Sequence, residues 1–238
     1  MDPLSDAKVI DSWHTNATPW TSAVREKRIE SRKLVTDAAV VDAVMSRAPK
    51  SVLDIGCGEG WLCRALAARG VAQVIGVDVV PSLIDQARVA GGGEFKVASY
   101  EAIARGALDV RVDVAVANFA LIGKEAVDAL ITASPTLLNP GGALIVQTLH
   151  PVIATGDLPY EDGWRKGSWA GFSEDFSDPA PWFFRTLETW VGLIASSGLR
   201  LVEVREPIHP ATRKPASVIF VAVSSRGGEA DEGSSLRS

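Results

Sequence analysis

The chain has 238 residues, of which 47% are hydrophobic and 22% charged, a composition that supports one α/β domain with a sizeable core. Its formal net charge of −5 argues against a nucleic-acid substrate, because affinity for phosphates comes from clustered Lys and Arg. No apolar run reaches the roughly 20 residues of a membrane span, and the N-terminus lacks a secretory pattern, so we expect a cytoplasmic protein without a membrane contact. Two cysteines and three separated histidines supply no zinc-type ligand cluster, so no metal site is predicted.

In chain order, the first regular pattern is helical and covers roughly residues 20–46, where apolar residues form one stripe. Short apolar runs then alternate with helical stretches. The runs predict strands at residues 51–55, 73–78, 94–98, 110–118 and 142–150. The helical stretches cover residues 61–69, 81–90, 124–134 and 182–197. Strands that alternate with helices pair in parallel through right-handed crossovers, which predicts a doubly wound α/β sheet.

The carboxyl-terminal half departs from this alternation. Residues 199–205 and 217–223 have the pattern of two strands joined by a proline-rich connection, so we expect an antiparallel pair at one edge of the sheet. Residues 151–181 match neither period, and so long a loop inside a compact domain is typical of a functional or mobile segment, here a substrate cover. We expect one domain over residues 1–224 and a disordered tail over residues 225–238, where apolar residues are scarce.

The most specific local signal is the run DIGCGEG at residues 54–60, which ends the first predicted strand and opens a helix. Its glycines allow a sharp turn and a close approach of a ligand to the backbone. A dinucleotide loop spaces its glycines as G-x-G-x-x-G, whereas the third glycine here comes one residue early. Asp54 would repel a diphosphate and suits a ligand that carries an ammonium or sulfonium group.

Asp78 ends the next predicted strand, 18 residues after Gly60. A carboxylate at this place can accept hydrogen bonds from both hydroxyls of a ribose. The alternative is that Asp78 caps the following helix. The pairing of the glycine loop with an acidic residue at this interval favours the ribose.

These residues resemble the class I S-adenosylmethionine-dependent methyltransferases, in particular the small-molecule branch called type 11 or type 12, over roughly residues 51–150. The resemblance implies a three-layer Rossmann-like fold with a seven-stranded sheet in the order 3-2-1-4-5-7-6, in which strand 7 is antiparallel, and an N-terminal cover helix. It also implies S-adenosylmethionine as the cofactor and S-adenosylhomocysteine as the product.

The same resemblance assigns cofactor contacts. Asp54 faces the methionine ammonium, often through water, and Asp78 binds the ribose. The remaining positions are the glycine loop beneath the methionine part (Gly56, Cys57, Gly58 and Gly60), the adenine neighbours (Val79, Ser99 and Tyr100) and the region where the sulfonium meets the substrate (Asn118, Phe119 and Ala120). DNA and protein amide methyltransferases carry Asn or Asp followed by Pro-Pro and an aromatic residue at that last place, so this sequence argues against such substrates.

The segment 13–33 resembles the helix that many relatives fold over the cofactor, within cover helices expected at about residues 13–46. Trp20, Arg28 or Arg32 would then touch the methionine carboxylate. The alternative is a solvated helix that packs a single tryptophan.

Methyl transfer from a sulfonium is an in-line displacement, so the protein mainly aligns the acceptor and excludes water. His150, at the end of the fifth predicted strand, is the candidate base, and the alternative is a His-Pro turn of structural purpose. The candidate substrate contacts are Tyr160, Trp164, Trp169, Trp182 and Arg185. The alternatives are aromatic packing on the sheet edge and a solvated arginine.

The sequence is compatible with three functions. The leading hypothesis is methyl transfer to oxygen, nitrogen or carbon of a small molecule. A nicotinamide-dependent oxidoreductase is disfavoured by the glycine spacing and by Asp54. A non-catalytic sensor or interaction module that binds S-adenosylmethionine or S-adenosylhomocysteine remains the alternative, because no base is certain. The sequence leaves the acceptor atom and the oligomeric state open.

Overall fold

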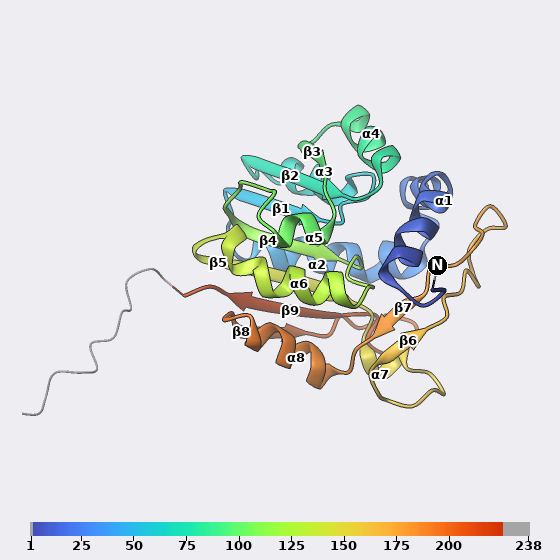
Figure 1. Ribbon diagram of the computed structural model, residues 1–238. Coiled ribbons are helices and arrows are strands. Elements are labelled where there is room, and N and C mark those ends of the chain that lie inside the picture. The colour runs from blue at the N-terminus through green and yellow to red at the C-terminus, as the bar shows by residue number, and fades with distance from the viewer. Residues whose placement is uncertain (1, 226–238) are drawn as a thin grey trace, which may run out of the picture.

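The computed structural model of the protein describes residues 2–225, so the tail expected to be disordered lies, from residue 226 onward, outside the described residues. A seven-stranded sheet in the order β3-β2-β1-β4-β5-β9-β8 forms its centre (Figure 1). The strands are β1 (Ser51–Ile55), β2 (Gln73–Asp78), β3 (Glu94–Val97), β4 (Val112–Asn118), β5 (Leu138–Thr148), β8 (Arg200–Arg205) and β9 (Val218–Val223). The first five pair in parallel, whereas β9 runs antiparallel to both β5 and β8. The predicted strand order and antiparallel edge are confirmed.

Successive side chains of each strand point to opposite faces of the sheet, and apolar side chains on both faces need cover. Helices therefore pack on both faces. In β1, Val52 packs with the buried cluster that contains Val44 and Leu66, whereas Leu53 joins the cluster that contains Leu130 and Ile194. The helices on the first face are α2 (Asp37–Met45), α3 (Trp61–Ala68) and α4 (Pro81–Ala90). Those on the second face are α5 (Tyr100–Ala104), α6 (Glu125–Ala133) and α8 (Leu187–Ser196).

The sequence pattern predicts one helical segment over residues 20–46, whereas the structure has separate helical segments in this region. Helix α1 (Asp6–Arg25) starts earlier, with the Ser5 side chain as its N-cap, and the chain turns at Lys27, whose φ is 54°. A π-helical turn, η1 (Arg32–Thr36), then leads into α2. Helix α1 lies across the carboxyl ends of the central strands (Figure 1). No helix within residues 2–225 is long and apolar enough to cross a membrane.

The predicted helix over residues 182–197 is wrong in its first part. Trp182–Phe184 forms strand β7, which pairs antiparallel with β6 (Gly163–Arg165), and α8 begins only after Thr186, whose side chain accepts a hydrogen bond from the Thr189 amide. Bulky aromatic residues favour strands, and this preference prevails over the helical spacing that links Phe183 to Leu187, Trp190 and Ile194. Arg185 therefore precedes the helix instead of lying one turn into it.

Two strand ends also differ from the prediction. β5 extends from Leu138 to Thr148, so His150 lies outside it and serves as the N-cap residue of the short helix α7 (Pro151–Ala154). The restricted backbone before a proline ends the strand there. The sequence pattern also gave no sign of α5, which follows β3 after an N-cap at Ser99.

Candidate functional site

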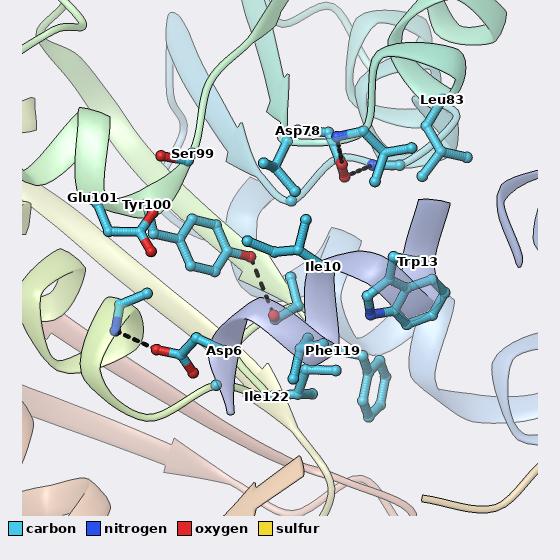
Figure 2. A pocket seen from close by; sticks show the side chains of 18 of the residues that line it. Asp6, Ile10, Trp13, Asp78, Leu83, Ser99, Tyr100, Glu101, Phe119 and Ile122 are labelled. Atoms are coloured by element: carbon cyan, nitrogen blue, oxygen red, sulfur yellow. Dashed lines mark hydrogen bonds between the residues drawn. The ribbon is translucent and has the colours of Figure 1, made fainter. Parts of the chain in front are cut away.

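A cavity of about 830 Å³, including its open mouth, lies between α1 and the carboxyl ends of β1, β2 and β4. Figure 2 shows its wall, with Asp78 and Leu83 on one side and Phe119 and Ile122 on another. The predicted residues that line this first cavity are Trp20, Gly56, Gly58, Asp78, Val79, Ser99, Tyr100, Asn118, Phe119 and Ala120. This is the edge at which open α/β sheets bind ligands.

Gly56 sits where three structural elements meet. Its φ is +73°, and a Cβ at this position would lie 2.4 Å from the Ala120 Cβ and 2.8 Å from the Tyr100 Oη. The amides of Gly56 and Cys57 both donate to the Val77 carbonyl, at 2.8 and 2.9 Å. The loop therefore turns sharply and stays close to β2, which leaves its outer surface open to the cavity.

Asp78 is the acidic group that the glycine loop holds in place. Its Oδ2 accepts a hydrogen bond from the Gly58 amide and its Oδ1 accepts one from the Val80 amide, each at 2.9 Å. Burial raises the pKa of this carboxyl, and the bonds from these amides oppose the shift. Each oxygen keeps acceptor capacity for a further donor. The Asp78 side chain thus offers an oriented acceptor pair to a ligand with hydroxyl groups.

Asp54 and Gly60 are not in the wall of either cavity. Asp54 is buried below the glycine loop, where the Cys63 thiol donates to its Oδ2 at 3.5 Å, and burial raises its pKa to about 7. Gly60 is required for packing, since a Cβ there would lie 2.9 Å from the Phe95 ring. Both residues support the glycine loop through buried contacts, and the contact of Asp54 with the methionine ammonium, often through water, stays a prediction.

The segment after β3 supplies an end wall. Ser99 caps α5 by accepting a hydrogen bond from the Ala102 amide. Tyr100 donates its hydroxyl proton to the Ala120 carbonyl at 3.1 Å, and burial raises the pKa of this phenol well above its usual value. The Tyr100 hydroxyl therefore holds the loop after β4 in place, and the uncharged side chain presents a neutral surface to the cavity.

Part of the first cavity comes from the N-terminal helix, and sequence reasoning missed most of these residues. Asp6, Val9, Ile10 and Trp13 of α1 line it. Asp6 also accepts hydrogen bonds from the amides at the start of α6, at 2.6 Å from Lys124 and 2.8 Å from Ala126, which caps that helix. Val9, Trp13 and Ala17 recur every fourth residue, and this helical spacing is a signal that the sequence offers for the segment.

A second, larger cavity of about 1680 Å³, including its open mouth, adjoins the first. The two share Trp13, Trp20, Gly56, Gly58, Asn118, Phe119 and Ile122 in their linings. The second cavity adds mainly aromatic and apolar groups, among them Cys57, Trp61, Leu149, Trp169, Phe172, Trp182 and Phe183. A ligand that crosses from one cavity to the other passes Gly56 and Asn118.

Arg32 carries the cationic group beside this crossing. Its guanidinium stacks 4.6 Å from the Trp61 ring centre and 5.8 Å from that of Trp20, and its Nε donates to Asp37 at 2.9 Å. Its Nη2 is buried without a hydrogen-bond partner among the described residues. Arg28, in contrast, pairs with Glu26 on the surface and lines neither cavity, so of the two predicted arginines only Arg32 reaches the site.

The predicted substrate contacts separate into two groups. Trp169, Trp182 and Arg185 line the second cavity, but Tyr160 and Trp164 do not. The Tyr160 hydroxyl instead accepts a hydrogen bond from the Leu187 amide, and the Trp164 ring packs on Phe183 across β6 and β7. Arg185 is 2% exposed and its guanidinium pairs with Asp128 at 2.7 Å, so its charge is already neutralised.

His150 does not reach the cavities. The residue is 5% exposed, its Nε2 lies 2.7 Å from the Glu206 Oε1, and it is absent from both linings. The geometry supports the alternative of a buried turn residue that fixes the connection between β8 and β9, and it gives no support to a catalytic base at this position.

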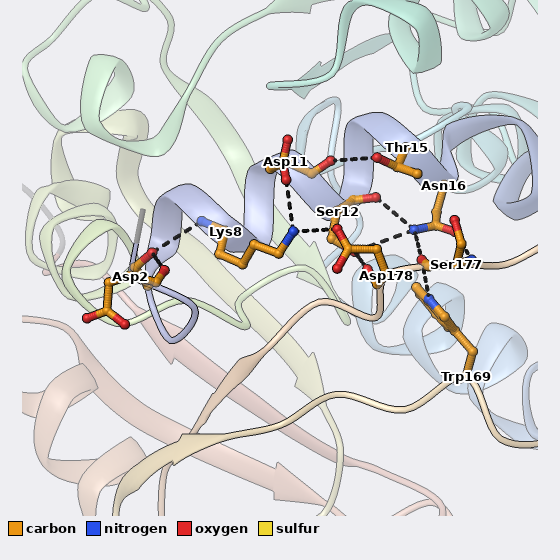
Figure 3. Close-up of polar contacts among 10 residues, drawn as sticks. Asp2, Lys8, Asp11, Ser12, Thr15, Asn16, Trp169, Ser177 and Asp178 are labelled. Atoms are coloured by element: carbon orange, nitrogen blue, oxygen red, sulfur yellow. Dashed lines mark hydrogen bonds and ion pairs between the residues drawn. The ribbon is translucent and has the colours of Figure 1, made fainter.

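A polar clasp joins α1 to the loop that covers the second cavity (Figure 3). Asn16 is fully buried; its Nδ2 donates to the Ser177 carbonyl at 2.7 Å and its Oδ1 accepts from the Ser177 amide at 3.0 Å. Ser12 and Lys8 bind Asp178 alongside, through its carbonyl and its carboxylate. The clasp joins α1, which lines both cavities, to the loop of residues 166–181, which lines the second one. These two segments together form the roof of the site.

Comparison with known proteins agrees with this geometry. Residues 28–204, well over half of the chain, match a family model described as a methyltransferase domain. The chain belongs to this methyltransferase family. The class I resemblance drawn from the glycine loop and Asp78 is thereby confirmed.

Individual relatives of the methyltransferase domain are distant. The chain is 30% identical, over 152 residues, to a ubiquinone biosynthesis O-methyltransferase of Cupriavidus pinatubonensis, an alignment that covers 62% of this chain and 61% of that protein. An S-adenosylmethionine-dependent methyltransferase from Mesorhizobium loti has the same fold, with a TM-score of 0.59, 22% identity and coverage of 78% and 96%. A Haloferax volcanii methyltransferase complex with the Trm112 activator gives a TM-score of 0.65 at 16% identity, over 93% and 100% of the two chains.

Proposed function

We propose that this protein is an enzyme that transfers a methyl group from S-adenosylmethionine to a small molecule. One observation carries the proposal: Asp78 and the glycine loop line a cavity that opens directly into a second, aromatic one. A cofactor in the first cavity and an acceptor in the second would meet beside Gly56 and Asn118. The O-methyltransferase name of the Cupriavidus relative supports a small-molecule acceptor.

In this proposal the first cavity holds the adenosine part. The free acceptor capacity of Asp78 serves the ribose hydroxyls, and Val79 and Ser99 lie beside the adenine. The methionine part lies over Gly56 and Gly58, where Arg32 binds its carboxylate in the role that the sequence gave to Trp20, Arg28 or Arg32. The bound cofactor supplies an activated methyl group on a sulfonium. The protein aligns the two reactants and excludes water by means of the roof.

The second cavity holds the acceptor. Trp169 and Trp182 offer aromatic surface, and residues 151–181 form the substrate cover within a single domain of residues 1–224. Aromatic side chains supply much contact area to planar or apolar ligands. We propose a soluble, cytoplasmic enzyme that needs no nucleic acid or membrane.

Calorimetric titration with S-adenosylmethionine, S-adenosylhomocysteine and NADH tests the cofactor. We expect micromolar binding of the two adenosyl compounds to the wild type and its loss in Asp78→Ala. The matched control is Asp109→Ala, an exposed acid that lines neither cavity. Binding of NADH alone would overturn the proposal. Binding of the adenosyl compounds without methylation of any acceptor in a broad panel would favour the sensor function instead.

A further inference from the structure

Asn118 is the polar side chain at the crossing between the cavities, and a buried network fixes how its amide points. The neighbouring strand contributes Gln147, which is 1% exposed. The Gln147 Nε2 donates to the Asn118 Oδ1 at 2.6 Å and to the Thr36 carbonyl at 3.0 Å. Its Oε1 accepts from the Ser217 hydroxyl at 3.3 Å.

This network determines the orientation of both amides. A primary amide has two N–H donors and one carbonyl acceptor. Gln147 uses both donors on oxygen atoms, and one of these, the Thr36 carbonyl, can only accept. If Gln147 were flipped, its oxygen would face that carbonyl, which is repulsive. The Asn118 Oδ1 therefore faces Gln147, and the Asn118 Nδ2 is the group of this side chain that can donate a hydrogen bond to a ligand.

We propose that Gln147 is a positioning residue that keeps the Asn118 Nδ2 donor at the crossing, and that the methyl acceptor is therefore an oxygen anion, such as a phenolate, enolate or carboxylate. This inference rests on the proposed function and narrows its substrate class. An anionic oxygen has several lone pairs, so it can accept a hydrogen bond from the Asn118 Nδ2 and still attack the methyl group. The same donor would block the single lone pair of a neutral amine, and it opposes an ammonium group.

The surrounding charges agree with an anionic acceptor. Among the described residues, none of those that line both cavities has a titratable side chain, so no base at the crossing can remove a proton. No Asp or Glu of the described residues lines the second cavity, so no fixed negative charge there opposes an anionic acceptor. An acceptor oxygen that arrives ionised forms the new O–C bond as the C–S bond breaks. Its negative charge cancels the sulfonium charge, and no proton has to leave.

The test compares acceptor pairs that share a ring and differ in charge, 1-naphthoate and 1-naphthylmethylammonium, by titration into protein saturated with S-adenosylhomocysteine. We expect the wild type to bind the carboxylate at least tenfold more tightly. Gln147→Glu replaces the Nε2 donor by an acceptor, so Asn118 flips and presents its Oδ1. The ratio should then fall at least tenfold, which a merely structural role of Gln147 would not produce.

Two further variants keep the test decisive. Gln147→Met serves if the glutamate variant does not fold, and it should lower the ratio without reversing it. Ser217→Ala, which removes a contact of Gln147 but none of its donors, should leave the ratio within threefold. Failure of the wild type to bind S-adenosylhomocysteine would overturn the proposed function. Normal cofactor binding with a preference for the ammonium probe, or a ratio unmoved in Gln147→Glu and Gln147→Met, would overturn this inference alone.

Discussion

Gly56→Ala is the substitution for which the structure gives the most definite cost. Alanine at a φ of +73° costs roughly 1–2 kcal/mol of backbone strain. The new Cβ would lie 2.4 Å from the Ala120 Cβ, and relief of such overpacking typically costs about 1–3 kcal/mol more. The free energy of unfolding should therefore fall by roughly 2–5 kcal/mol, which corresponds to a Tm lower by about 4–20 °C for a chain of this size.

Gly70→Ala separates the two contributions. Gly70 has a similar φ of +89°, but a Cβ there would meet no atom within 4 Å. This control should lose only the backbone term of roughly 1–2 kcal/mol. Urea denaturation of both variants, followed by tryptophan fluorescence and circular dichroism, measures the difference. Calorimetry with S-adenosylhomocysteine should show weakened binding for Gly56→Ala and unchanged binding for Gly70→Ala.

A rescue experiment tests the cause of the Gly56→Ala defect. Ala120→Gly removes the atom with which the new Cβ collides, so the double variant Gly56→Ala/Ala120→Gly should recover part of the lost stability beyond additivity. Equal losses in Gly56→Ala and Gly70→Ala, or strict additivity in the double-mutant cycle, would refute the argument that close packing at the crossing constrains this glycine.

Three other perturbations follow from the site. Because burial raises the pKa of Asp54 to about 7 in the folded state, the folded protein binds more protons than the unfolded chain between about pH 4 and 7. The free energy of unfolding should therefore fall by on the order of 4 kcal/mol as the pH rises through that range, and Asp54→Asn should lose this part of the slope in urea titrations. Arg32→Met should weaken S-adenosylhomocysteine binding about 10- to 100-fold by calorimetry, through loss of a charged hydrogen bond of roughly 1.5–3 kcal/mol, whereas the surface variant Arg28→Met should bind normally. Asn16→Ala should speed hydrogen exchange in residues 166–181 and cost about 1–3 kcal/mol, whereas Thr15→Ala, at an exposed site, should stay within about 0.5 kcal/mol; equal exchange rates would contradict the clasp.

The central sheet could be predicted from the sequence because burial leaves a periodic trace. Strands β1 and β2 begin and end at the expected residues, since both faces are buried and their apolar runs are continuous. The glycine loop was equally visible, because it requires residues of one kind at fixed spacing. Trp182–Phe184 shows the limit of periodicity, as three bulky residues before a helix fit either period.

Which predicted residues meet at the site was harder to foresee, because that depends on a few side-chain contacts. Arg28 and Arg32 are one helical turn apart in sequence, yet the chain turns between α1 and η1, and only Arg32 stacks on Trp61. The sequence suggests His150 as a base because this residue ends a predicted strand. The 2.7 Å contact with Glu206, 56 residues away, has no local signature.

The sequence predicts the cover segments, but not the contacts that hold α1 in place. Helix α1 is fastened at three places: Asp6 caps α6, Asn16 binds the backbone of Ser177, and Arg25 pairs with the buried Glu59 of the glycine loop at 3.0 Å. Asp6 and Asn16 bind backbone groups, which almost any residue supplies. Glu59, the partner of Arg25, lies far from it along the chain. Because Glu59 stands between Gly58 and Gly60, a shift of the glycine loop must move Arg25 or break its ion pair. The ion pair thus couples the glycine loop to α1, which lines both cavities, through a contact that leaves no periodic pattern in the sequence.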